Sequence, residues 1–291
     1  MRVEKYYWKR TSSVELYGKL YIPDGRMSVL VIMVHGIGEH GECYDEWAKR
    51  FALQSFGFLM FDMRGHGRSS GIRGHVCIDA VKDDIRVIVS DMQKKFADIP
   101  IVLFGYSLGG QIVLSQAIDG NVMIRGVIAS SPLLKLVKPP SLLLVRLAKF
   151  ASYIMPWFTV KTGIKAGQLS RDGNSAKSTK TDPLLHKKIS VKLFSDLYAG
   201  GEIILRNKCR PDIPVLLMHG DADPLVSYEA VKQYAQNAGK TVTFKKWQGM
   251  YHDLLNDVGN EVVFYYTVKW LSKYIIEDGT VQNSRKMYRV A

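Results

Sequence analysis

Short apolar runs that end in turn residues recur along the chain and alternate with segments of helical periodicity. The predicted strands cover residues 29–34, 58–61, 101–104, 124–129, 214–218 and 241–247. The predicted helices cover residues 46–56, 79–96, 108–118, 229–238 and 262–275. Because each crossover returns the chain to the same edge of a sheet, this alternation predicts an α/β fold with a mostly parallel central sheet and helices on both faces. An antiparallel edge strand is expected over residues 14–22, and functional residues at the carboxyl ends of the strands.

One interval, residues 133–205, contains no strand of comparable quality. Its first part, residues 141–158, is apolar on nearly every side, carries Arg146 and Lys149, and breaks at Pro156. We expect the interval to form a helical cap, inserted into a core that comprises residues 1–132 and 206–291. The alternative is a set of ordinary core helices, since a helix that is apolar all round is usually buried.

Composition narrows the class of partner. A net charge of +13 favours anionic partners such as an acidic lipid surface. No Lys/Arg block lies beside interleaved aromatic residues, so nucleic acid is not expected as a partner.

The three cysteines are too few and too widely spaced for a disulfide framework or a zinc ribbon. With neither a signal-peptide pattern nor an apolar stretch of about 18 residues, we expect a cytoplasmic protein that touches membranes only peripherally, through the cap.

The segment Gly105-Tyr106-Ser107-Leu108-Gly109 matches the G-x-S-x-G pattern of a nucleophile elbow. The bare pattern is weak, because three fixed positions with common residues also match by chance. Here, however, the pattern follows a predicted strand and opens a predicted helix, which is the context that the elbow requires. Small residues are needed because the turn is sharp and strained. The sequence therefore predicts Ser107 as a nucleophile.

A serine hydroxyl needs a general base, and the base needs an acid that holds its tautomer. In this kind of fold the chain order is Ser, then Asp or Glu, then His. Two predicted strands downstream of Ser107 end near Asp223 and His252, where the loops should converge. We predict Asp223 as the orienting acid and His252 as the base. Asp221 is the less favoured acid and fits a turn or capping role, and a buried structural role is expected for His219.

Transition-state charge requires two backbone N–H donors that point at the developing oxyanion. The residue after the nucleophile, Leu108, supplies one of them. The second is expected from Ile37, in the loop after residues 29–34, where flanking glycines let the backbone approach a substrate.

Four histidines in the first third of the chain raise the question of a metal site: His35, His40, His66 and His75. Their spacing does not match H-E-x-x-H, and the cysteines complete no tetrahedral set. We therefore expect no metal and no cofactor.

Together these segments resemble the monoglyceride lipase and lysophospholipase branch of the α/β hydrolases, which is also grouped with serine aminopeptidases. The shared motifs are HGIGEHGECY (35–44), FDMRGHGRSSG (61–71), GYSLGG (105–110), SSPLL (130–134), TDPLL (181–185), HGDADPLV (219–226) and YH (251–252). They cover most of the chain, in order. The resemblance implies an ester hydrolase that acts on single-chain lipids, with the cap forming the acyl tunnel. A cap rich in large apolar residues and bearing cations can line such a tunnel and also rest on an anionic lipid surface.

The chain departs from this resemblance on the alcohol side. Family members have an Arg just before the tyrosine that matches Tyr44, and a second His three residues after the catalytic one; this chain has Cys43 and Leu255 there. Glu39, the family's acidic residue beside the entrance, is retained and is expected to bind substrate. Glycerol selectivity is therefore an open question.

Two alternatives remain. One is a general carboxylesterase or a serine aminopeptidase-like peptidase. The other is a noncatalytic binding protein with this fold, against which the intact set of Ser107, Asp223 and His252 argues.

Overall fold

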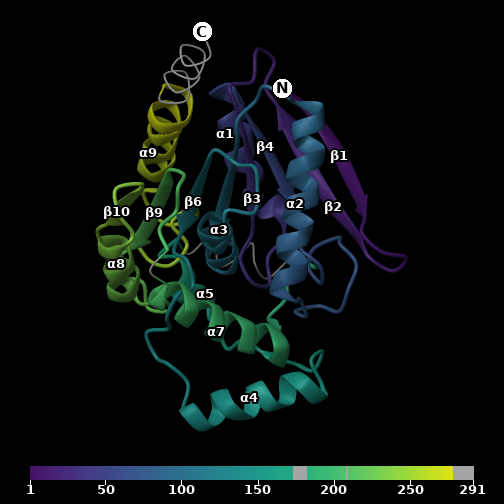
Figure 1. The fold of residues 1–291 in the computed structure, drawn as a ribbon, viewed down its shortest axis with the longest axis vertical. Coiled ribbons are helices and arrows are strands. Elements are labelled where there is room, and N and C mark those ends of the chain that lie inside the picture. The colour runs from purple at the N-terminus through teal and green to yellow at the C-terminus, as the bar shows by residue number, and fades with distance from the viewer. Residues whose placement is uncertain (173–181, 208, 278–291) are drawn as a thin grey trace.

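The computed structural model describes residues 1–172, 182–207 and 209–277, and centres on an eight-stranded sheet (Figure 1). Thr181, the first residue of one motif quoted above, lies outside the described residues. The strand order is β1-β2-β4-β3-β5-β6-β9-β10. The strands are β1 (Arg2–Lys9), β2 (Glu15–Ile22), β3 (Val29–Val34), β4 (Phe56–Phe61), β5 (Ile101–Tyr106), β6 (Gly126–Ser130), β9 (Val215–Gly220) and β10 (Val242–Trp247). All pairs from β4 to β10 are parallel, which confirms the predicted mostly parallel sheet.

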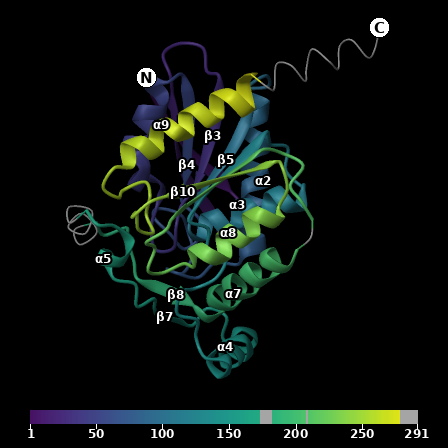
Figure 2. The ribbon, with the colours of Figure 1, turned by 90° about the vertical axis from the view of Figure 1, so that its left-hand side faces the viewer.

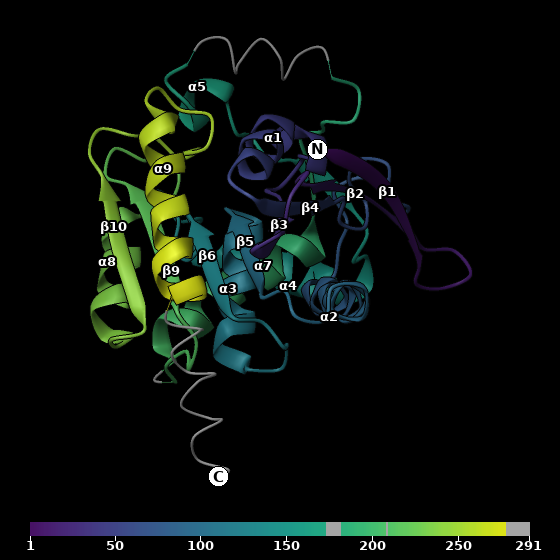
Figure 3. The same cartoon turned by 90° about the horizontal axis from the view of Figure 1, so that it is seen from above.

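Helices cover both faces of the sheet, as expected (Figure 3). One face packs against α2 (Ile78–Lys95), α3 (Leu108–Asp119) and α8 (Tyr228–Asn237). The other packs against α1 (Asp45–Leu53), which follows the short helix η1 (Gly41–Tyr44), and against α9 (Asn260–Leu271), which continues into η2 (Ser272–Glu277). Side chains of β3 alternate between these two cores, so a strand buried on both faces reads as one continuous apolar run.

The amino-terminal strand was not expected. β1 consists mainly of charged and aromatic residues, and only Trp8 is buried, so it lacks the apolar run that marks the inner strands. Its pairing with β2 is antiparallel, and β2 pairs with β4 on its other side. The prediction of an edge strand over residues 14–22 was therefore wrong in position, although right in direction, because β1 occupies the edge.

The segment 133–205 lies between β6 and β9, and its described residues, 133–172 and 182–205, add no strand to the main sheet. Its described residues contain α4 (Leu142–Ile154), β7 (Thr159–Lys161), α5 (Ala166–Leu169), β8 (Lys188–Ser190) and all but the last residue of α7 (Val191–Arg206). The short β7–β8 sheet was not expected in a helical segment. The segment is anchored by α7, which contacts α2 and α3, whereas α4 contacts α7 and lies outside it (Figures 1 and 2).

No residue of α4 is buried, so α4 is not a core helix. The alternative of ordinary core helices is therefore wrong for this part of the segment. In the described part of the chain, no helix has both the length and the apolar character that a membrane crossing needs.

Candidate active site

The turn between β5 and α3 lifts Ser107 out of regular structure, with φ of 53° and ψ of −109°. A Cβ atom at Gly105 would lie 2.2 Å from the carbonyl oxygen of Gly109, and one at Gly109 would lie 1.9 Å from that of Val34. Only glycine fits at these two positions. The strained turn that the sequence predicts is thus held by close backbone packing underneath the serine.

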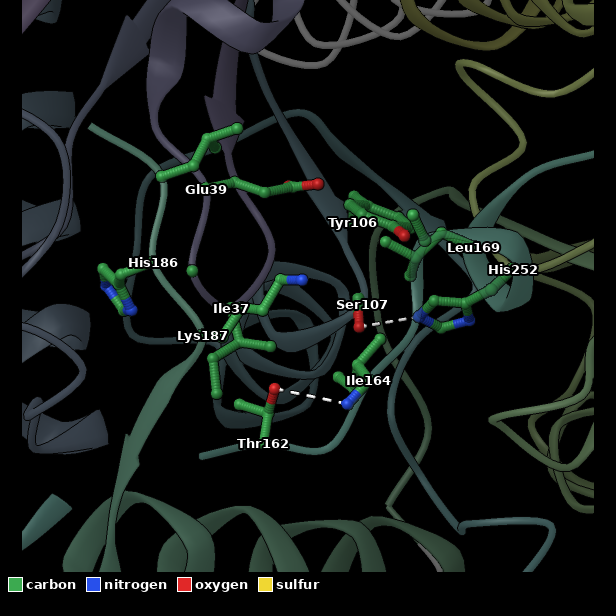
Figure 4. Close-up of a pocket in the computed structure, with 13 residues that line it drawn as sticks. Ile37, Glu39, Tyr106, Ser107, Thr162, Ile164, Leu169, His186, Lys187 and His252 are labelled. Carbon is green, nitrogen blue, oxygen red and sulfur yellow. Dashed lines mark hydrogen bonds between the residues drawn. The ribbon is translucent and has the colours of Figure 1, made fainter. Parts of the chain in front are cut away.

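A chain of hydrogen bonds joins the three residues that the sequence singled out. The Ser107 Oγ lies 2.9 Å from Nε2 of His252 (Figure 4). On the opposite side of the ring, Nδ1 lies 2.6 Å from Oδ2 of Asp223. The other carboxylate oxygen of Asp223 accepts hydrogen bonds from the backbone N–H groups of Leu225 and Val226, at 2.8 and 3.0 Å. The loops after β5, β9 and β10 therefore converge at one buried site.

Charges around His252 fix how it titrates. Burial by itself lowers the pKa of His252, but the carboxylate of Asp223 and its hydrogen bond, together with Asp253 and Glu39, raise the pKa above the ordinary 6.5. Burial raises the pKa of Asp223, but His252 and a hydrogen bond from His219 outweigh burial and hold it well below its usual range. Asp223 is therefore ionised at neutral pH, and the imidazole of His252 is a stronger base than that of a free histidine.

The rival acid, Asp221, does not contact His252. Its Oδ1 accepts a hydrogen bond from the backbone N–H of Gly249 at 2.6 Å, and its Oδ2 lies 3.3 Å from Nζ of Lys246. Asp221 thus joins the loops after β9 and β10, in keeping with the turn role expected for it.

His219 is fully buried, as expected, but it also contacts the acid. Its Nε2 lies 3.0 Å from Oδ2 of Asp223. This contact was not predicted, because the two residues lie four apart, one at a strand end and the other in the loop that follows.

The loop after β3 carries Ile37, which lines the pocket beside Ser107 (Figure 4). On one side of Ile37, the N–H of Gly36 donates to Oε2 of Glu39 at 3.0 Å. On the other side, Gly38 has φ of 77° and accepts a hydrogen bond at its carbonyl from the N–H of His186 at 2.9 Å. Leu108 begins α3, so its N–H has no acceptor within the helix.

Glu39 lines the same pocket and is half-buried. Its Oε2 also accepts a hydrogen bond from the hydroxyl of Tyr44 at 2.6 Å. Burial, followed by the charge of Asp253, raises the pKa of Glu39 to about 7. Near neutral pH this carboxyl can therefore both donate and accept hydrogen bonds toward the pocket.

The outer wall of the pocket comes from the segment 133–205. The residues that it contributes are Thr162, Ile164, Ala166, Leu169, Leu185, His186 and Lys187. No residue of 141–158 lines the pocket, so within the expected cap the lining comes from residues 162–187 and not from the most apolar stretch. Residues 141–158 face outward instead. The apolar residues that do line the pocket are isolated among polar neighbours, and such a pattern does not identify a lining in a sequence.

Two loops of the site are tied to the segment 133–205. Besides the bond between His186 and the loop after β3, the N–H of Asp253 donates to the carbonyl of Leu169 at 2.8 Å. The guanidinium of Arg171 pairs with the buried carboxylate of Asp257 at 3.0 Å. These contacts hold the segment to the loop that carries His252.

The early histidines form no metal cluster. The rings of His35 and His66 lie 5.1 Å apart, and His66 lies 4.6 Å from His186. Burial lowers the pKa of His35 to about 3, which keeps it neutral. His40 and His75 bond instead to side chains of the segment 133–205, at 2.8 and 3.0 Å. Among the residues that the structure describes, no three His, Cys, Asp or Glu side chains are grouped to hold a metal ion.

The two positions that depart from the resemblance do not face the pocket. Leu255 is fully buried, and its carbonyl accepts a hydrogen bond from the indole N–H of Trp47 at 2.9 Å. Cys43 is partly buried, which raises the pKa of its thiol. Neither residue is part of the pocket lining.

Comparison with known proteins agrees with this arrangement. Residues 25–259 match the family described as serine aminopeptidase, S33. The chain is 30% identical to the rat (Rattus norvegicus) monoglyceride lipase, over 91% of this chain and 89% of the lipase. It is also 30% identical to an uncharacterized abhydrolase domain-containing protein of Dictyostelium discoideum, over 88% of this chain but only 28% of that longer protein.

Among solved structures, the monoacylglycerol lipase of Paleococcus ferrophilus superimposes with a TM-score of 0.81 at 32% identity, and the match covers 89% of this chain and 99% of that one. The sheet order, the elbow and the family match all lead to the same assignment. The chain has the α/β-hydrolase fold and belongs to the serine aminopeptidase (S33) family of serine hydrolases.

Proposed function

We propose that the protein hydrolyses carboxylic esters of single-chain lipids, monoacylglycerol or lysophospholipid, through an acyl-enzyme on Ser107. The observation that carries the proposal is the buried relay from Asp223 through His252 to Ser107, which ends in a pocket with several apolar lining residues. The resemblance to monoglyceride lipases over about 90% of the chain supports the same substrate class. No cofactor is invoked.

In the acylation step, Oγ of Ser107 attacks the ester carbonyl carbon while Nε2 of His252 takes the hydroxyl proton. Asp223 holds the tautomer that carries its proton on Nδ1 and stabilises the imidazolium. The backbone N–H groups of Ile37 and Leu108 bind the oxyanion. When the intermediate collapses, His252 gives its proton to the departing alcohol, and the acyl group remains on the serine.

In the deacylation step, a water molecule gives a proton to His252 and its oxygen attacks the acyl carbon. Collapse of the second intermediate breaks the bond to Oγ, and Ser107 recovers a proton from His252. One ester and one water molecule thus become one acid and one alcohol. We assign Glu39 to the alcohol, because its carboxyl both accepts and donates near neutral pH.

We further propose that residues 133–205 act as a cap whose inner wall, including Ile164, Leu169 and Leu185, receives the acyl chain. The outer side of this cap fits an anionic lipid surface. The segment holds twelve Lys and Arg against four Asp and Glu. Large apolar residues of α4 are 56 to 76% exposed: Leu142, Leu143, Leu147, Phe150 and Tyr153. A contiguous exposed apolar surface among cations is typical of peripheral membrane contact.

Lys187 favours lysophospholipid over monoacylglycerol as the natural substrate. It lies on the pocket wall across from His252 (Figure 4) and, among the described residues, forms no salt bridge with a carboxylate. An ammonium group there would pair with the phosphate of a lysophospholipid. Lys187→Met should lower kcat/KM for lysophosphatidylcholine by about tenfold, or 1.4 kcal/mol, and leave monoacylglycerol unaffected. Equal effects on both lipids would remove this preference.

Fluorophosphonate labelling of the wild-type protein and of Ser107→Ala tests the chemistry. Labelling should be present in the first and absent in the second, with both folded by circular dichroism. A panel of monoacylglycerols, lysophospholipids, p-nitrophenyl esters and aminoacyl arylamides then tests the substrate. Faster cleavage of arylamides than of esters would make the protein a peptidase, and an unlabelled wild-type protein would make it a noncatalytic binding protein.

Glycerol recognition should be weak, because Cys43 and Leu255 offer no side-chain hydrogen bond to the pocket. We expect kcat/KM for a monoacylglycerol to exceed that for the ethyl ester of the same acid by less than about tenfold, or about 1.4 kcal/mol. A preference of a hundredfold or more would mean that other residues rebuild a glycerol site.

A further inference from the structure

We propose that His219 is a positioning residue of this site: it shares the Asp223 carboxylate with His252, and thereby controls how strongly that carboxylate supports the base. The inference rests on the proposed function, in which His252 accepts the proton of Ser107. It assigns a role in catalysis to a residue that would otherwise be a buried structural histidine.

One carboxylate oxygen of Asp223 lies close to both imidazoles. Oδ2 of Asp223 lies 2.6 Å from Nδ1 of His252 and 3.0 Å from Nε2 of His219. Oδ1 is already bonded to two backbone N–H groups of the same loop. The carboxylate of Asp223 is therefore contacted by two imidazoles and two backbone N–H groups, and both imidazoles compete for the same oxygen.

The surroundings of His219 fix which of its nitrogens carries the proton. Both polar neighbours of Nε2 are acceptors, namely Oδ2 of Asp223 and, at 3.3 Å, the carbonyl oxygen of Val226. Nε2 must therefore be the donor. Nδ1 is buried and has no hydrogen-bond partner within the described part of the chain. Leaving a buried nitrogen unpaired is costly, and an apolar side chain would avoid that cost, so the contacts of Nε2 with Asp223 and Val226 together account for an imidazole here.

Charged and aromatic groups also surround the two imidazoles. His252 contacts Asp223, the charges of Glu39 and Asp253 also act on it, and the ring of Tyr106 packs at 5.3 Å. On the other side, the ring of Tyr228 lies 6.2 Å from that of His219. Of the carboxyl groups named here, only that of Asp223 is within hydrogen-bonding distance of both rings.

A donor that occupies Oδ2 draws off part of the charge that would otherwise stabilise the His252 imidazolium. Removing the donor concentrates that charge on His252, whose pKa then rises. The free base needed for catalysis would be reached only at higher pH. His219 thus keeps the base available closer to neutral pH.

Two substitutions separate this role from simple packing. His219→Gln keeps an N–H donor near the place of Nε2, and His219→Leu removes it. The midpoint of the acid limb of kcat/KM, measured with p-nitrophenyl butyrate, should rise by about half a pH unit or more in His219→Leu and stay within about 0.2 in His219→Gln. The low-field NMR signal of the proton on Nδ1 of His252 should titrate with the same shift. If His219→Leu does not fold, His219→Met takes its place.

Superimposable pH profiles for the donor-free variant and the wild-type protein would overturn the inference. So would lower melting temperatures in both variants with unmoved midpoints, which is what a structural role alone produces. The NMR titration requires no turnover, so it tests the shared carboxylate even if no ester is hydrolysed; failure of the proposed function and failure of this inference are therefore distinct results.

Discussion

Replacing Asp223 by Asn changes a single atom at the centre of the site. Oδ2 accepts from His252, whereas the amide nitrogen that replaces it can only donate. Oδ1 remains free to accept from Leu225 and Val226, whose N–H groups fix the orientation of the side chain. The amide N–H then points at Nδ1 of His252 and forces the proton onto Nε2. In that tautomer Nε2 cannot take the proton of Ser107.

The expected loss in kcat is on the order of 10⁴, the factor that the equivalent change produces in a serine protease triad, and corresponds to about 5.5 kcal/mol. The geometry gives no reason for a smaller value, because the carboxyl side chain is fully buried and its bond to His252 is short, at 2.6 Å. The amide would also meet Nε2–H of His219 as a second donor, which adds strain to the variant.

The measurement is hydrolysis of p-nitrophenyl butyrate at saturating substrate, with circular dichroism to establish that the variant folds. Asp221→Asn is the matched control, since it changes the same atom two residues away and should cost less than tenfold. A loss below tenfold for Asp223→Asn, or a larger loss for Asp221→Asn, would refute the assignment of the acid.

Three further outcomes follow from the site and its support. Because the pKa of His252 is raised above 6.5 and the base works in its neutral form, kcat/KM should fall with decreasing pH around a midpoint above 6.5; a midpoint below 6 would contradict this in a pH series. Ile164→Gln should lower kcat/KM for long-chain p-nitrophenyl esters about tenfold more than for the acetate, while Leu147→Gln on the exposed α4 changes neither in a micelle-free assay; equal losses on both esters would place Ile164 in the core. Asp84→Asn should lower the free energy of unfolding in urea by about 3 kcal/mol, because this buried carboxylate pairs with the guanidinium groups of Arg64 and Arg10. A loss below about 1 kcal/mol would show that these ion pairs do not stabilise the fold.

The sequence sufficed for the sheet and for the residues at its carboxyl edge because local signals there are strong. Inner strands are apolar on both faces, and the elbow needs glycines at fixed positions, as Gly105 and Gly109 show. Since the carboxyl ends of parallel strands meet at one edge, Ser107, Asp223 and His252 could be brought together without coordinates.

The remaining features depend on contacts between distant parts of the chain. β1 is stabilised by pairing with β2 and by Trp8, whose indole N–H reaches Asp91, and not by an apolar pattern of its own. The sequence did not show which part of the cap faces the pocket, because hydrophobicity alone does not say which surface a helix such as α4 covers. His219 was recognised as buried, whereas its bond to Asp223 depends on how the loop after β9 turns back.

The ties between residues 133–205 and the loops of the site have a consequence for protein engineering. A graft that replaces this segment with that of a relative would exchange the substrate wall, but it would also cut the bonds from His186 to Gly38 and from Leu169 to Asp253. The donor's backbone would have to reproduce both, or the recipient would lose turnover along with its old selectivity. Libraries confined to side chains such as Ile164 and Leu185, with the backbone anchors left in place, are the safer route to a new acyl preference.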